Sequence, residues 1–253
     1  MKISVLDVDI CETCMSHKCS FLNIAQINSA FHKLPSETTV CPTLAIEDNG
    51  PVGLFAPDGH IISDKCVECG LCVAFCDKKN LQFSELESGH LPFGRLTELQ
   101  LKATVSQYLI NLFEFSANTN RNKALLFDGY VATGSGEEAF VEIDYGNDSL
   151  KCARRLLGDM LMFSGPRNIR NGLLVLSDIP THGSRDVYTL IEKIRSFPGT
   201  NDINIFMTTF SILRKLTLTV NRSDYSLNDL FYNCLNESLT QYEERLEELI
   251  SSN

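Results

Sequence analysis

The chain has 253 residues, of which 43% are hydrophobic and 21% charged, a composition that excludes disordered, collagen-like and membrane-embedded classes. Its formal net charge of -10 argues against a protein that coats nucleic acid indiscriminately. No apolar run approaches the ~18 residues of a membrane span, and the N-terminal segment MKISVLDVDICETC lacks the apolar core of a secretion signal. We therefore expect a cytoplasmic protein without membrane attachment.

Charge is distributed unevenly along the sequence. Residues 1–95 carry 7 basic and 12 acidic residues, residues 96–223 carry 14 and 13, and residues 224–253 carry 1 and 7. The middle segment is the least acidic, so it is the part that would meet phosphate groups at the smallest electrostatic cost. Its candidates for a basic face, against the simpler alternative of solvated helix surface, are Arg154, Arg155, Arg167, Arg170, Arg214 and Lys215.

Cysteine usage indicates metal or redox chemistry. The chain has 10 cysteines and no recognisable export signal, and cytosolic reductants keep thiols free of disulfides. Cys152 and Cys234 stand alone among apolar neighbours, as buried small hydrophobic residues do. The other eight lie in the first third of the chain: Cys11, Cys14, Cys19, Cys41, Cys66, Cys69, Cys72 and Cys76.

The cysteine spacing favours iron–sulfur clusters. Residues 66–76 read CVECGLCVAFC, where three thiolates of one loop can bind three corners of a single cluster and the fourth is in excess. An upstream run over 11–19, followed by Cys41-Pro42, supplies a second set. These runs closely resemble the bacterial two-[4Fe-4S] ferredoxin family over about residues 8–84. The resemblance implies one cluster on Cys11, Cys14, Cys19 and Cys76, and another on Cys66, Cys69, Cys72 and Cys41.

Zinc is the competing interpretation of the same cysteines. Cys11-x2-Cys14 and Cys66-x2-Cys69 are spaced like the knuckles of tetrahedral all-thiolate zinc sites. A zinc site has no use for a further cysteine two residues on, whereas a cubane cluster does. Iron–sulfur clusters are therefore the favoured prediction, with Gly70 letting the backbone approach the cluster closely.

The rest of the chain is long enough for a second domain. A two-cluster ferredoxin fold needs only the first 85 to 95 residues, roughly, so we expect domains at 1–94 and 95–253, joined near Pro92 and Gly94. The second domain is predicted to be mixed α/β. The patterns first predict a helix over 99–113 behind a Thr97–Gln100 capping box, and then a hairpin of 123–133 and 139–145. Helices over 148–163 and 185–197 are then predicted to alternate with strands over 172–178 and 203–210. The chain is predicted to end in a long helix over 226–250 capped by Ser226.

Three acids fall on the predicted hairpin. Asp128 ends the run ALLFD in its first strand, while Glu142 and Asp144, two residues apart on the second, share one face. If they converge, such hard oxygen ligands suit Mg²⁺ or Mn²⁺, which can activate water for phosphodiester hydrolysis. The competing interpretation is that Glu142 and Asp144 face solvent on an edge strand.

The order of helix, hairpin bearing D…E-x-acid, helix and buried strand resembles the PD-(D/E)XK restriction-endonuclease-like fold. The resemblance implies that Asp128, Glu142 and Asp144 are the catalytic and metal-binding residues. Asp144 stands where the family usually has lysine, and Lys151 is our candidate for the replacement cation. The predicted fold is thus α+β/α/β, a two-cluster ferredoxin-like domain followed by a mixed α/β endonuclease-like domain.

The leading functional hypothesis is a metal-dependent DNA endonuclease of the restriction or phage-defence type, with DNA and a defence-system protein as partners. Its two [4Fe-4S] clusters would be structural or regulatory, and a purely structural role would make folding depend on iron. The alternative is an electron-transfer ferredoxin whose second domain docks a redox partner, which the acidic balance favours. The sequence does not determine the DNA target, the redox partner or the cluster potentials. It is compatible with a dimer but does not determine the oligomeric state.

Overall fold

The computed structural model describes residues 3–6, 10, 66–76, 78–83, 96–117, 128–145, 148–167, 169–178, 184–196, 203–220 and 225–252. The chain divides into two compact units, Met1–Asn111 and Leu112–Asn253. This division falls within the last turn of helix α4 (Glu98–Leu112), whereas the sequence places a boundary before that helix, between residues 94 and 95. No helix in the described ranges is both long and apolar enough to cross a membrane.

In the N-terminal unit, two short strands bracket the cysteine-rich region in sequence. Strand β1 (Ile3–Val5) pairs antiparallel with β2 (Leu81–Phe83), in a register that sets Ile3 opposite Phe83. Helix α3 (Leu71–Ala74) precedes β2, and its Leu71 is fully buried. The α4 helix starts at the predicted capping box: the Gln100 side chain accepts from the Thr97 N–H at 2.9 Å, and the Thr97 hydroxyl accepts from the Gln100 N–H at 3.3 Å.

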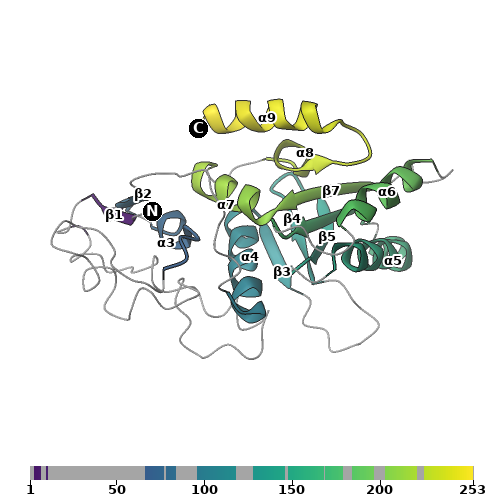
Figure 1. The fold of residues 1–253 in the computed structure, drawn as a ribbon, viewed down its shortest axis with the longest axis horizontal. Helices are drawn as coiled ribbons and strands as arrows, with labels where there is room; N and C mark the ends of the chain where they lie inside the picture. Colours follow the sequence, from purple (N-terminus) through teal and green to yellow (C-terminus); the bar gives the residue numbers. More distant parts are fainter. Residues whose placement is uncertain are drawn as a thin grey trace. The chain divides into compact units, whose positions relative to one another are not determined.

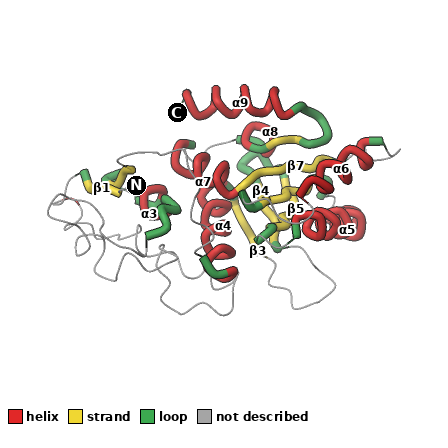
Figure 2. The backbone as a smooth tube through the Cα atoms, in the orientation of Figure 1, coloured by secondary structure: helices red, strands yellow, loops and turns green. Residues whose placement is uncertain are grey.

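The C-terminal unit contains a six-stranded mixed sheet in the order β3-β4-β5-β6-β7-β8 (Figures 1 and 2). β3, β4 and β5 form an antiparallel meander, β5, β6 and β7 run parallel, and β8 returns antiparallel to β7. The predicted mixed α/β class is confirmed. The strands are β3 (Glu114–Ala117), β4 (Gly129–Ala132), β5 (Glu138–Ile143), β6 (Asn171–Leu176), β7 (Asn204–Thr209) and β8 (Tyr232–Asn233). The helices of this unit are α5 (Ser149–Arg167), α6 (Ser184–Arg195), α7 (Phe210–Thr219), α8 (Leu227–Leu230) and α9 (Leu239–Ser251).

The predicted hairpin is confirmed. β4 and β5 pair antiparallel, with Gly129 opposite Val141 and Ala132 opposite Glu138. The turn between them contains Gly136 at φ +85°, in the left-handed region that glycine adopts without steric cost, and its N–H donates to the Thr133 carbonyl at 3.0 Å. This turn fixes the register and therefore fixes which β5 side chains share a face.

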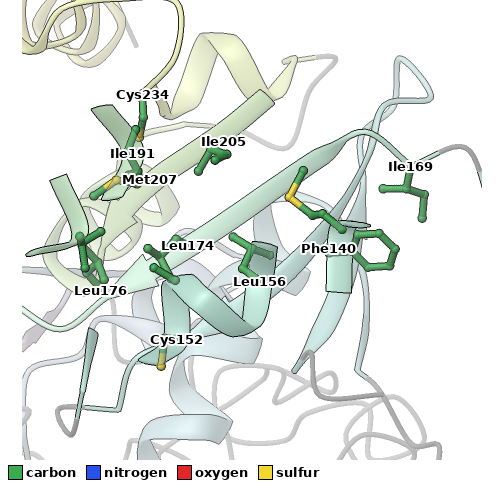
Figure 3. Packing of buried hydrophobic residues seen from close by; sticks show 13 residues of the cluster. Phe140, Cys152, Leu156, Ile169, Leu174, Leu176, Ile191, Ile205, Met207 and Cys234 are labelled. Atoms are coloured by element: carbon green, nitrogen blue, oxygen red, sulfur yellow. The ribbon is translucent and has the colours of Figure 1, made fainter. Parts of the chain in front are cut away.

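Helices α5 and α6 cover one face of the sheet and bury its main core (Figure 1). Figure 3 shows Leu156 of α5 packed with Leu174 of β6 and Phe140 of β5 in this core. Contact between α5 and β6 is so close that a Cβ on Gly172 would lie 2.5 Å from the Met160 sulfur. Such packing places the even-numbered side chains of β5, Glu142 among them, beneath α5.

The predicted long terminal helix is wrong. Ser226 does cap a helix, through a capping box with Asp229, but that helix, α8, ends at Leu230. β8 follows and pairs with β7, with Tyr232 opposite Met207, so it satisfies the edge of β7. A second capping box, between Ser238 and Gln241, then starts α9. Two further elements, β3 and α7, were not predicted.

Candidate functional site

The described thiols of the N-terminal unit lie on one short loop followed by one turn of helix. Cys69 and Cys72 are buried, and Cys66 and Cys76 are half-buried. Two residues in this loop have positive φ, Glu68 at 55° and Gly70 at 80°. A positive φ is unusual for glutamate and is kept only where the surroundings impose it. The loop is therefore held in a specific shape around Cys69.

Two hydrogen bonds fix this loop. The Tyr108 hydroxyl, fully buried on α4, donates to the Cys69 carbonyl at 2.6 Å. The Asn80 N–H donates to the Cys76 sulfur at 3.3 Å. Hydrogen bonds from N–H groups to cysteine sulfur are also found around metal-bound sulfur. The other predicted cluster ligands, Cys11, Cys14, Cys19 and Cys41, lie outside the described residues.

In the C-terminal unit, the three predicted acids lie at one end of the β4–β5 pair. Asp128 immediately precedes β4, and its Oδ2 accepts from the Ile143 N–H at the end of β5, at 2.9 Å. Glu142 and Asp144 flank Ile143, and both are fully buried. Since β5 lies between β4 and β6, the alternative that these acids face solvent on an edge strand is wrong.

The Glu142 carboxylate is paired with the guanidinium of Arg155, which reaches it from α5. Burial raises the pKa of Glu142 to about 9, the Asp128 charge adds to this increase, Arg155 opposes it, and Asp159 adds to it. Neither carboxylate oxygen of Glu142 accepts a hydrogen bond of normal geometry from a described residue. This buried acid thus has one strong partner and unused acceptor capacity.

Asp144 ties the end of β5 to the start of α5. Its Oδ2 accepts from the Ser149 hydroxyl at 2.5 Å, and its N–H donates to the Val175 carbonyl of β6 at 2.8 Å. Cys152, one turn along α5, is buried under the same strand, and its thiol lies 3.7 Å from the Ile143 carbonyl. Burial, reinforced by the Glu142 and Asp144 charges, raises the pKa of this thiol to about 12.

The structure thus brings the predicted acids to one place without closing them into a ligand set. Within the described ranges, no three His, Cys, Asp or Glu side chains are gathered closely enough to hold a single ion. The hydrogen bonds of Asp128 and Asp144 to Ile143 and Ser149 each use one carboxylate oxygen. Lys151, the predicted replacement cation, is exposed on α5, and Arg155 is the cation that contacts Glu142.

A pocket of about 480 Å³ lies along α5, beside this cluster. Arg155 and Asp159 belong both to the pocket wall and to the surroundings of Glu142. The described residues lining the pocket are Asp148, Leu150, Lys151, Arg154, Arg155, Gly158, Asp159 and Met162.

Sequence reasoning missed Asp159, Ser149 and Tyr108, and counted Arg155 only among possible basic surface residues. A usable signal exists for two of them. Arg155 and Asp159 recur at helical spacing with Cys152 and Leu156, on the apolar side of α5 that meets the sheet. Charged residues on the buried stripe of an amphipathic helix indicate a partner in the sheet.

Comparison of the chain with models of known protein families, with curated proteins and with solved structures found no match.

Proposed function

We propose that the protein is an iron–sulfur protein whose C-terminal unit is a metal-dependent DNA endonuclease. The observation that carries the proposal is the position of Asp128, just before β4: its carboxylate accepts from the Ile143 N–H next to Glu142 on β5, and its charge raises the pKa of Glu142. The order β3-β4-β5-α5-β6, an antiparallel meander followed by a helical crossover to a parallel strand, agrees with the restriction-endonuclease-like fold. This order supports assigning catalysis to these acids.

The chemistry of Glu142 fits a divalent metal ion. Burying a carboxylate against a single guanidinium is costly, and a metal cation beside it offsets that cost. Magnesium is commonly held by one or two carboxylates, with water and substrate phosphate completing its shell, so Asp128 and Glu142 suffice as protein ligands. When bound, such an ion supplies an activated water and stabilises negative charge on the phosphate under attack.

The neighbouring residues have supporting roles in this proposal. Asp144 holds the first turn of α5 against β5 through Ser149, which keeps Glu142 beneath the helix. Arg155 contacts Glu142 in the metal-free protein and favours its charged form, against the burial that favours protonation. Arg155 also lines the pocket, so it belongs both to the surroundings of Glu142 and to the place where a phosphate would enter.

The N-terminal unit is proposed to bind two [4Fe-4S] clusters. Cys66, Cys69 and Cys72, with Cys41, would hold one, and Cys76 would join Cys11, Cys14 and Cys19 on the other. Three observations support this assignment. The strands that precede and follow the cysteine region in sequence, β1 and β2, pair with each other. The cysteine loop has two residues with positive φ, and the Asn80 N–H donates to the Cys76 sulfur. A structural or regulatory role leaves hydrolysis to the C-terminal unit.

Electron transfer is the second candidate, and the hydrogen bond from Asn80 to the Cys76 sulfur is the observation that favours it. Donors to sulfur raise the potential of a cluster and are the means by which proteins tune electron carriers. In that case the C-terminal unit would dock a redox partner, and its buried acids would have only a structural role.

The proposal is tested with full-length protein purified without oxygen and incubated with supercoiled plasmid in Mg²⁺, Mn²⁺ or EDTA. We expect metal-dependent nicking or cutting that Asp128→Asn and Glu142→Gln each reduce by more than about 100-fold, since even outer-shell partners of metal ligands contribute 10–100-fold. Glu138→Gln, which removes an exposed acid from the same strand, is the matched control and should leave the rate unchanged. Absence of cleavage on every DNA tested, with reversible bleaching by dithionite, would instead support electron transfer.

A further inference from the structure

The pocket along α5 has the charge of an anion site. Three cations line it, Lys151, Arg154 and Arg155, against Asp148 and Asp159. The three cations outnumber these two acids by one, Asp159 is buried, and the Asp148 carboxylate accepts from the Lys151 backbone N–H at 2.9 Å. Neither the Lys151 ammonium nor the Arg154 guanidinium forms an ion pair with another described residue.

Helical spacing places these cations on one face. Arg154 and Arg155 follow Lys151 by three and four residues, so each is a neighbour of Lys151 on the next turn of the helix. Lys151 and Arg154 are exposed, whereas the Arg155 side chain is only 32% exposed. The positive charges therefore extend from the solvent-exposed surface toward the core, and the most buried of these residues, Arg155, contacts Glu142.

We propose that this pocket binds the backbone phosphate of a nucleic acid strand, with Lys151 and Arg154 as its direct contacts. The proposal deepens the endonuclease function and rests on it for the identity of the strand. Phosphate is the group that clustered Lys and Arg recognise, and nucleases need it held next to the metal. The backbone is favoured over a free nucleotide because the described lining residues include no aromatic side chain on which a base could stack.

Arg155 links this pocket to the carboxylates and is a positioning residue. Its planar guanidinium has donors in a fork, so one edge can stay with Glu142 while another turns toward the pocket. A phosphate held by Lys151 and Arg154 would share Arg155 with Glu142 and lie directly beside that carboxylate. Binding of the strand and assembly of the reaction site would then occur together.

The test measures binding in EDTA, where no hydrolysis occurs. Fluorescence anisotropy of a labelled duplex of about 20 base pairs is titrated with wild type, with Lys151→Ala/Arg154→Ala, and with Arg185→Ala/Lys193→Ala. The last variant removes one exposed arginine and one exposed lysine from α6, so both double variants change the net charge equally. Thermal unfolding of all three proteins checks that the exposed substitutions leave the fold intact.

We expect Lys151→Ala/Arg154→Ala to weaken binding about 10- to 100-fold and to lower the slope of log affinity against log salt by about two, one for each lost phosphate contact. The control should change affinity less than about threefold. Equal weakening by both double variants would overturn the proposal, because it would mean that charge acts diffusely, and so would unchanged affinity in both. Displacement of the duplex by ATP at equal phosphate concentration would also overturn it in favour of a nucleotide site.

These outcomes are separable from failure of the proposed function. If wild type binds DNA through Lys151 and Arg154 but cleaves nothing in Mn²⁺, the phosphate pocket stands and the endonuclease proposal fails. If the double variant binds and cleaves like wild type, the pocket proposal fails while the endonuclease proposal stands.

Discussion

The guanidinium of Arg155 lies against the carboxylate of Glu142, and through this pair helix α5 is tied to the centre of the sheet. The pair is asymmetric, because Glu142 is fully buried whereas the Arg155 side chain is 32% exposed. A partly exposed arginine side chain can be exchanged for another cation with less rearrangement of the core than a buried one would need. The ion pair therefore marks the position that we assign to the metal.

Glu142→Gln should make the metal-free protein more stable at alkaline pH. The folded pKa of about 9 lies above the ordinary value of 4.5, so the fold favours the protonated acid, and stability decreases as pH rises from about 4.5 to about 9. The amide is neutral throughout, which removes this slope, of ~1 kcal/mol per pH unit. Urea unfolding in EDTA at pH 5, 7 and 8.5 measures how the free energy of unfolding depends on pH, with Glu138→Gln as the control. If Glu142→Gln had the same pH slope as wild type, the prediction would be contradicted.

Gly172→Ala should destabilise the C-terminal unit by about 1–3 kcal/mol, the usual cost of overpacking a core. The new Cβ would lie 2.5 Å from the Met160 sulfur and 3.1 Å from Leu156, so α5 or both side chains must shift. Gly158→Ala, on α5 itself, is the matched substitution. Its Cβ would meet no atom within 4 Å, and the higher helix propensity of alanine should increase the stability of the protein by ~1 kcal/mol. Paired thermal melts that place the two variants in the opposite order would show that the α5–β6 contact is wrong.

Cys69→Ser should remove about half of the bound iron and acid-labile sulfide, from about eight of each per chain to about four. The substitution affects the set assigned to Cys66, Cys69, Cys72 and Cys41 and leaves the other set intact. Colorimetric iron and sulfide assays on anaerobically purified protein measure the change. Zinc in place of iron, in wild type, would refute the cluster assignment outright.

Cys152 and Cys234 should resist iodoacetamide at pH 8 in the native protein. Both are buried, and because the pKa of Cys152 is about 12, almost none of it is the reactive thiolate. Peptide mass spectrometry should find both alkylated only after unfolding in urea. In protein stripped of iron, the half-buried Cys66 provides the reactive reference; native labelling of Cys152 at a comparable rate would contradict its burial.

Local pattern was sufficient to predict the β4–β5 hairpin, the start of α4 and the helix–strand order from α5 to β7. Alternating side chains, turn glycines and capping boxes act within a few residues, so they can be read from the sequence. The extended region after Ser226 was misread because its periodicity continues, whereas the unpaired edge of β7 draws Tyr232 and Asn233 into β8. α7 was missed because its cap, Thr209, is also the last residue of β7.

The candidate site was predicted only in part, because local patterns do not show which elements pack against each other. Spacing on a strand places Glu142 and Asp144 on one face, but it does not reveal that β6 pairs beside β5 and that α5 covers them. Those contacts bury Glu142 and select Arg155, rather than Lys151, as its cation. Both depend on packing between elements that lie apart in the sequence.

The most direct test of the central claim is a crystal structure of full-length protein soaked in Mn²⁺, with an anomalous difference map collected at the manganese edge. We predict a peak bound by oxygens of Asp128 and Glu142, with the Arg155 guanidinium moved from Glu142 toward the α5 pocket. An intact Arg155–Glu142 pair with no peak beside it, in crystals whose surface sites have taken up manganese, would contradict the account.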